Sequence, residues 1–185
     1  MARNIEIKAR ISRIEDVLPQ AARLADSGPT AISQDDTFFA CPNGRLKLRD
    51  FGDGTGQLIF YQRPDLAGPK ESFYVIAPAG DPESLRQVLT LAQGQAGRVR
   101  KKRTLYLIGR TRVHLDRVEG LGDFLELEVV LAENESSEAG VAEATRLLAQ
   151  LGIAEAQLCT GAYVDLLAEA AAAGAPTAAS ETRTA

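Results

Sequence analysis

Charged side chains recur at every second position in several short segments of this 185-residue sequence. In the segment from Asn4 to Ile11, polar and apolar residues alternate without a break, and the segment from Arg45 to Arg49 alternates in the same way. Side chains two positions apart lie on the same face of a β-strand. Each of these segments therefore predicts a strand with one apolar face and one charged face.

The charged faces are rich in cations of two kinds. Arginine presents a planar fork that matches phosphate oxygens, and lysine presents a mobile point charge. If these faces meet around a common cavity, so many cations require a polyanion, and a triphosphate is the natural candidate. The cations that could line such a cavity are Lys8, Arg10, Arg45, Lys47, Arg49, Arg63, Lys101, Arg103, Arg110 and Arg112.

Four carboxylates lie on the same faces, namely Glu6, Asp116, Glu126 and Glu128. Glu126 and Glu128 are two residues apart, which places them about 7 Å from each other along one strand. Carboxylates beside a cation-rich phosphate site could bind Mg²⁺ or Mn²⁺, since both are hard ions that prefer oxygen ligands. Salt bridges to the neighbouring cations would account for them equally well, without a metal.

These side chains must be positioned by strands and helices that the sequence also predicts. Ser12 with Glu15 forms the pattern of a helix capping box, and Asp81-Pro82 is typical of a helix start. We expect strands near residues 4–11, 36–41, 45–49, 58–63, 71–76, 99–108, 110–116 and 124–129, and helices near 12–27, 82–93, 137–151 and 162–168.

The amphipathic helices need a hydrophobic surface to pack against. If the apolar faces of the strands lined a small closed core, the helices would have no such surface. This need is met by an α+β fold in which the apolar strand faces point outward, under the helices, and the charged faces point inward. An antiparallel β-barrel of about eight strands is wide enough to hold one small ligand. A sheet whose charged face lies in solvent remains an alternative.

Composition limits the class of protein. The hydrophobic content of 45% is enough for one domain with a sizeable core, and the net charge of −4 does not favour nucleic acid or an anionic membrane as a partner. We expect no leader and no membrane helix, because a strand begins almost at the first residue. The two cysteines match no metal-site spacing, so a cytoplasmic protein with reduced thiols is expected. Residues 171–185 lack apolar periodicity and predict a disordered tail after a domain over residues 1–170.

The order of these motifs resembles a known family. Ile5–Arg10 is similar to the Glu-x-Glu-x-Lys signature of CYTH proteins, the superfamily of class IV adenylate cyclase and thiamine triphosphatase, and the spacing resembles the class IV adenylate cyclase branch. Residues 3–168 are covered. Further similar segments are Gly44–Arg49, Tyr61–Asp65 followed by Gly68, Lys70, Ser72 and Tyr74, then Val99–Arg103, Arg112–Asp116, Gly122–Glu128 and Tyr163–Leu167.

The resemblance implies a triphosphate tunnel fold and metal-dependent attack on a triphosphate. It implies a metal site at Glu6, Glu126 and Glu128, with Asp116 nearby. It also implies phosphate binding by Lys8, Arg10, Lys47, Arg49, Arg63, Lys101, Arg103 and Arg112, with Lys8, Arg63 and Arg112 acting in catalysis. The first Glu of the signature is Asn4 here, an amide that could coordinate but brings no negative charge.

Three functions remain open. The first is cyclisation of ATP to cyclic AMP and pyrophosphate; the second is hydrolysis of tripolyphosphate or of an organic triphosphate such as a thiamine or nucleoside triphosphate. The third is polyphosphate binding without catalysis. The chain could also form a homodimer. His114, the one histidine, shares a face with Arg112 and Asp116 and is expected to line the cavity. A role for His114 as a general base is an alternative that metal activation would make unnecessary.

Overall fold

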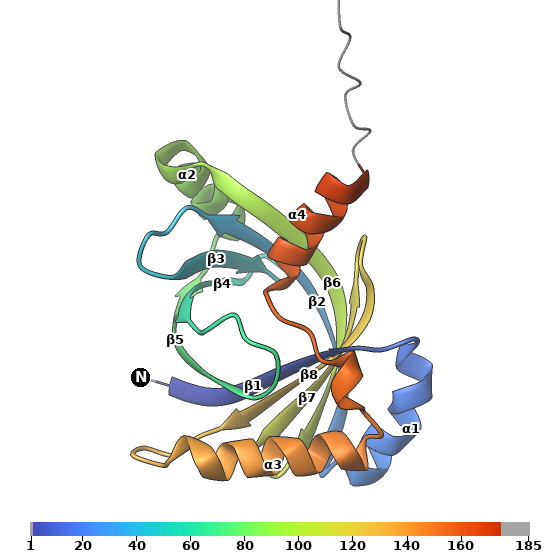
Figure 1. Cartoon of the computed structure of the whole chain (residues 1–185). Helices are drawn as coiled ribbons and strands as arrows, with labels where there is room; N and C mark the ends of the chain where they lie inside the picture. Colours follow the sequence, from blue (N-terminus) through green and yellow to red (C-terminus); the bar gives the residue numbers. More distant parts are fainter. Residues whose placement is uncertain (1, 175–185) are drawn as a thin grey trace, which may run out of the picture.

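The computed structural model describes residues 2–174. Eight antiparallel strands close into one barrel in the order β1-β5-β4-β3-β2-β6-β7-β8 (Figure 1). The predicted barrel is confirmed. The strands are β1 (Ala2–Arg10), β2 (Ser27–Phe39), β3 (Arg45–Asp50), β4 (Gly56–Gln62), β5 (Lys70–Ala79), β6 (Gln95–Ile108), β7 (Thr111–Val118) and β8 (Gly122–Val130).

The four α-helices within residues 2–174 lie outside the barrel (Figure 1). They are α1 (Ile14–Leu24), α2 (Pro82–Gln93), α3 (Ser137–Gln150) and α4 (Tyr163–Gly174), with a single 3₁₀ turn at Glu155–Gln157. Helices α1 and α3 pack on β1, β7 and β8, α2 packs on β2 and β3, and α4 packs on β6. None of the helices within residues 2–174 is long and apolar enough to cross a membrane.

The apolar strand faces point outward, as the alternation predicts. The largest hydrophobic cluster joins Ile5 and Ile7 of β1 and Leu125 and Leu127 of β8 to the buried side of α1 and α3. Helix α3 approaches β1 closely, since a Cβ atom at Gly140 would lie 2.6 Å from Ile5 Cγ1. Removing apolar area from water at about 25 cal/mol per Å² stabilises this outer layer. The inner faces are thereby left for polar groups.

A second cluster closes one end of the barrel from within. Phe38, Val99, Val118 and Phe124 come from four strands, and Tyr163 of α4 packs among them. The Phe124 and Tyr163 rings meet edge to face with centroids 5.0 Å apart. At this end of the barrel, apolar and aromatic groups therefore replace the charged lining.

Several boundaries differ from the sequence predictions. The capping box at Ser12 and Glu15 does not form; helix α1 begins at Ile14, whose backbone N–H donates to Asp123 Oδ2 at 2.9 Å. Strand β2 begins at Ser27, nine residues earlier than expected, because it pairs with β6 through an irregularity between Ser27 and Thr30.

The boundary predictions for α2 and α4 have different outcomes. The cap of α2 is confirmed, since Asp81 accepts a hydrogen bond from Ser84 N at 3.0 Å. Helix α4 continues to Gly174, so the predicted tail is wrong for residues 171–174. The rest of that prediction, residues 175–185, lies outside the described residues.

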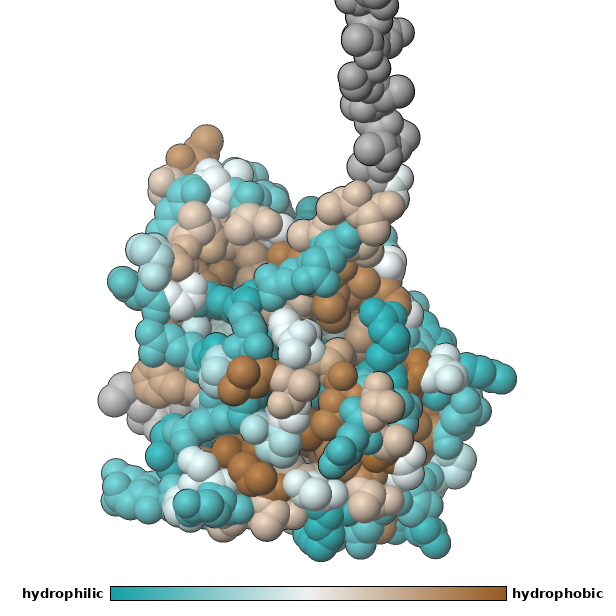
Figure 2. Space-filling model, viewed as in Figure 1, coloured by the Kyte–Doolittle hydropathy of each residue, from teal (hydrophilic) through white to brown (hydrophobic). Residues whose placement is uncertain are grey.

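One apolar feature of the surface is not covered by other elements. Val88 and Leu91 of α2 are exposed, and Figure 2 shows hydrophobic residues gathered at the tip of this helix. An exposed apolar patch of this kind often marks a protein contact. The homodimer stays a prediction.

Candidate functional site

All eight strands contribute side chains to a cavity of about 370 Å³ inside the barrel. Seven cations and four carboxylates are among the lining residues. The charged faces of the strands therefore meet around one space, and the alternative of a solvent-facing sheet is wrong. The charged residues that line it are Lys8, Lys47, Arg49, Arg63, Lys101, Arg103, Arg112, Glu6, Asp36, Glu126 and Glu128.

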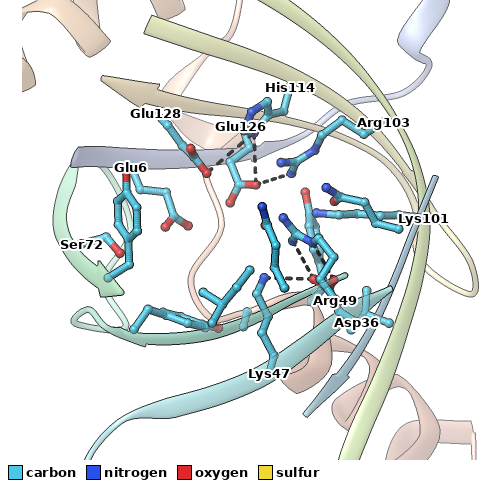
Figure 3. Close-up of a pocket in the computed structure, with 18 of the residues that line it drawn as sticks. Glu6, Asp36, Lys47, Arg49, Ser72, Lys101, Arg103, His114, Glu126 and Glu128 are labelled. Carbon is cyan, nitrogen blue, oxygen red and sulfur yellow. Dashed lines mark hydrogen bonds and ion pairs between the residues drawn. The ribbon is translucent and has the colours of Figure 1, made fainter. Parts of the chain in front are cut away.

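One side of the cavity holds a basic group built on β2 and β3 (Figure 3). Register places Asp36 opposite Arg49. Arg49 donates to both carboxylate oxygens of Asp36 at 2.7 Å, and Lys47 Nζ donates to Oδ2 at 2.9 Å. Burial alone would raise the pKa of Asp36, but the charges of Arg49 and Lys47 outweigh burial and hold the pKa far below its usual range. Burial, aided by repulsion from Arg49, lowers the pKa of Lys47 to about 8.

Asp116 lies behind the cavity wall and is not among the lining residues. Arg103 donates to both of its oxygens at 2.6 Å, Lys101 Nζ donates at 3.0 Å, and the Tyr163 hydroxyl donates at 3.0 Å. Burial opposes ionisation, but the charges of Arg103 and Lys101 hold the pKa of Asp116 below its usual range. Asp116 thus orients two cavity cations, and its part in a metal site stays a prediction.

The opposite side of the cavity holds the carboxylates Glu6, Glu126 and Glu128 of β1 and β8, with His114 of β7 beside them; we call these four residues the acidic group. Glu126 and Glu128 lie on β8, and Glu6 faces them from β1 (Figure 3). Arg63 Nη1 donates to Glu6 Oε1 at 2.5 Å, and Arg112 Nη1 donates to Glu128 Oε2 at 3.0 Å. Glu6 and Glu128 are therefore each paired with an arginine.

The protonation of the acidic group is uneven. Burial, and then the charge of Glu126, raise the pKa of Glu6 to about 7, and Arg63 and Lys8 offset only part of this shift. Burial also disfavours ionised Glu126, yet Lys8 and other cations hold its pKa well below the usual range. Burial lowers the pKa of His114, with repulsion from Arg103 as the next cause, so the imidazole is neutral near pH 7.

The residues present fit a divalent cation at the acidic group. One ligand atom each from His114, Glu126 and Glu128 lies within 4.8 Å of the other two. Four buried polar atoms of the cavity lining have no hydrogen-bond partner within residues 2–174, and two of them, His114 Nδ1 and Asn4 Oδ1, could donate a lone pair to a metal ion; the others are Gln34 Oε1 and Arg63 Nε. Carboxylates, an amide oxygen and an imidazole nitrogen are all donors that divalent ions accept in proteins.

Three predicted cations lie outside the cavity. Arg10 is exposed at the end of β1, where its guanidinium lies 4.6 Å from the Phe124 ring centroid and donates to the Leu121 carbonyl at 2.8 Å. Arg45 pairs with carboxylates at the outer rim, and Arg110 pairs with Glu135 and Glu143 on the surface. The strand alternation continues through these positions, but the cavity ends before them.

Two contributors were not identified as site residues from the sequence. Asp36 was expected only as the start of a strand, although it shares a face with Gln34 and Phe38, which also line the cavity. Tyr163 was expected on the closing helix without a role; its ring lies 4.1 Å from Lys8 Nζ and 4.9 Å from Lys101 Nζ. The alternation of β2 could have indicated Asp36, whereas no local pattern indicates Tyr163.

Comparisons with known proteins agree with this architecture. The family model described as CYTH domain matches residues 2–163. Adenylate cyclase CyaB of Aeromonas hydrophila is 26% identical over 170 residues, covering 86% of this chain and 85% of that protein. PH1012 protein from Pyrococcus horikoshii OT3 superimposes with a TM-score of 0.78 at 25% identity, covering 89% of this chain and 99% of that one.

A plant protein has the same fold at lower identity. HpAC1 from Hippeastrum, whose structure is described with a dominant triphosphatase activity, superimposes with a TM-score of 0.64 at 16% identity. The match covers 91% of this chain and 96% of HpAC1.

Proposed function

The chain belongs to the CYTH domain family, and from that premise we propose that it is a divalent-metal-dependent enzyme that acts on a triphosphate held inside the barrel. The observation that carries this proposal is the excess of cations over carboxylates among the residues that line the cavity, seven against four. Such an excess attracts a polyanion, and a cavity of about 370 Å³ suits a small molecule.

The two sides of the cavity suggest how the chain handles such a substrate. Lys47 and Arg49 of β3 and Lys101 of β6 offer charged donors and would bind phosphate oxygens with charge-assisted hydrogen bonds. The carboxylates of β1 and β8 would hold a divalent ion. When bound, that ion would withdraw charge from the phosphate oxygens and make phosphorus easier to attack. Arg63 and Arg112 reach the same space and would orient the chain of phosphates.

Cyclisation of ATP is the first candidate reaction. Its support is the relative named adenylate cyclase CyaB, which matches this chain over most of both lengths. In that reaction the ribose 3′-hydroxyl attacks the α-phosphorus, the P–O bond to the β-phosphate breaks, and pyrophosphate leaves. The hydroxyl proton passes to solvent or to a carboxylate of the acidic group.

Hydrolysis of a triphosphate is the second candidate. The acidic group is compatible with this reaction, because Glu6, Glu126 and Glu128 could orient a water molecule as readily as a ribose hydroxyl. Water would then attack the terminal phosphorus, the P–O bond to the adjacent phosphate would break, and phosphate and the shortened phosphate chain would be released, with the proton of the water passing to solvent or to a carboxylate of the acidic group. The lining cations would serve either reaction, so the nucleophile distinguishes the two.

The proposal also covers binding partners and cellular compartment. We propose no nucleic-acid or membrane partner, given the net charge of −4. The cysteines Cys41 and Cys159 are both free, which supports a reducing compartment such as the cytoplasm.

The test is incubation of the purified protein with ATP and, separately, with tripolyphosphate, each with Mg²⁺ or Mn²⁺. Cyclic AMP with pyrophosphate would support the cyclase. Phosphate without cyclic AMP would support the hydrolase, and tight binding without turnover would contradict both.

Matched arginine variants test whether the cavity is the site. Arg49→Ala and Arg112→Ala each remove a lining cation, and each should weaken tripolyphosphate binding by about 1.5–3 kcal/mol. Arg100→Ala is the control, because Arg100 lies on β6 but has a side chain 52% exposed outside the cavity. Equal affinity of all three variants and the unmodified protein, measured by calorimetry, would refute binding inside the barrel.

A further inference from the structure

His114 occupies an unusual place in the acidic group. It lies on β7 directly opposite Glu126 of β8, and its neighbour two positions along, Arg112, lies opposite Glu128. The imidazole is 4% exposed, and its Nδ1 atom lies 3.8 Å from Glu126 Oε2 and 3.8 Å from Glu128 Oε1 (Figure 3). The ring therefore points between two carboxylates.

No hydrogen bond explains this position. The separation of 3.8 Å exceeds hydrogen-bond reach, and Nδ1 has no other partner in the part of the chain that the structure describes. The carboxylates are bonded elsewhere, since Arg103 donates to Glu126 Oε2 at 2.9 Å and Arg112 donates to Glu128 Oε2. Leaving a buried polar atom unsatisfied is costly. Something other than the protein is therefore expected to complete the bonding of Nδ1.

From this geometry we infer that His114 Nδ1, together with Glu126 and Glu128, binds a first-row transition dication directly, and that the site prefers Mn²⁺ to Mg²⁺. This inference rests on the metal dependence in the proposed function and specifies the ion. A separation of 3.8 Å is less than two ligand bonds of about 2.0–2.2 Å laid end to end, so one ion can contact both atoms. The unpartnered Asn4 Oδ1 in the same lining offers an additional neutral oxygen.

The preference follows from ligand chemistry. Mg²⁺ dehydrates reluctantly and is bound in proteins mainly by oxygen. An imidazole nitrogen suits transition ions better, and affinity at a mixed site generally rises from Mn²⁺ towards the later ions of the row. A site of carboxylates alone would not discriminate in this way. His114 would thus add selectivity to a site whose charge comes from Glu126 and Glu128.

The experiment is electron paramagnetic resonance of the tag-free protein with Mn²⁺. His114 is the one histidine of the chain, so imidazole ¹⁴N modulation in the pulsed spectrum of bound Mn²⁺ can arise from this residue alone. The continuous-wave signal of free Mn²⁺ gives the affinity, and competition gives the Mg²⁺ affinity. We expect imidazole modulation in the unmodified protein.

His114→Gln supplies the matched comparison, because it keeps a polar side chain but has no imidazole. We expect the modulation to disappear and Mn²⁺ affinity to fall about tenfold or more, since loss of even an outer-shell partner of a metal costs roughly 10–100-fold. Mg²⁺ affinity should change less. Arg100→Ala should leave all these values unchanged.

Three outcomes would overturn the inference. They are bound Mn²⁺ without imidazole modulation, no Mn²⁺ binding at all, and an unchanged Mn²⁺-to-Mg²⁺ ratio in the variant. If His114→Gln fails to fold, the spectrum of the unmodified protein still decides. Imidazole modulation without turnover would refute the proposed function and leave this inference standing. Turnover without imidazole modulation would support the proposed function and refute this inference.

Discussion

Glu6 should make the metal-free protein less stable as the pH rises through neutrality. Its carboxyl is buried and faces Glu126, and its pKa is raised from 4.5 to about 7. A carboxyl whose folded pKa lies above its unfolded pKa holds its proton more tightly in the folded state. The stability that this proton contributes is complete below pH 4.5 and is lost as the pH rises through about 7.

The two pKa values give the size of the effect. Between about pH 5.5 and about pH 8, linkage from these values predicts a loss of about 2 kcal/mol in the free energy of unfolding. Glu6→Gln removes the titrating group and resembles the protonated form. The variant should therefore gain about 2 kcal/mol relative to the unmodified protein over the same pH change.

Urea unfolding of both proteins at the two pH values, with a chelator present, measures this difference. Lys47 also titrates in this range, but groups distant from Glu6 contribute equally to both proteins and cancel in the difference of differences. Glu119→Gln, with a side chain 71% exposed, serves as the control and should show no such change. A difference near zero, or one of opposite sign, would refute the raised pKa and the coupling of Glu6 to Glu126.

Three further predictions address single side chains. Asn4→Glu should tighten divalent-metal binding and raise turnover at limiting Mg²⁺ but not at saturating metal; superimposable metal-dependence curves would place Asn4 outside the metal shell. Asp36→Asn breaks a buried ion pair and should lower the free energy of unfolding by about 3–5 kcal/mol, with added tripolyphosphate raising the melting temperature more than in the unmodified protein; equal shifts would contradict this. Tyr163→Phe removes the hydrogen bond to Asp116 and should cost about 1.5–3 kcal/mol in urea unfolding, and a cost near zero would show that the hydroxyl is dispensable.

Much of the barrel could be predicted because alternation is a local property. Lys8 and Lys47 each sit at a charged position between apolar neighbours, and the structure places both in the cavity lining. Because the helices need an apolar surface to pack against, the charged faces could then be predicted to point inward. The prediction of strand faces required no knowledge of which strands are neighbours.

The errors arise where a distant partner decides the outcome. Asp123, 109 residues away, bonds the first N–H of α1 and displaces the capping box predicted at Ser12. Asp116 shares a face with His114, and the register of β6 and β7 sets Arg103 opposite it, so Asp116 pairs with Arg103 and Lys101. Neither pairing is visible in a single sequence, because the strand register depends on the closed barrel.

The presence of both signs inside the cavity has a physical reason. A lining of cations alone would leave several buried charges without partners, and breaking even one buried ion pair is strongly destabilising. Here Asp36 accepts hydrogen bonds from Lys47 and Arg49, Glu6 accepts one from Arg63, and Glu128 accepts one from Arg112. These charges are therefore paired within the protein when no substrate is bound. The cations still outnumber the carboxylates, which keeps the interior attractive to a polyanion. When a triphosphate binds, the lining cations would therefore exchange their carboxylate partners for phosphate oxygens. No further cations would be needed to bind it.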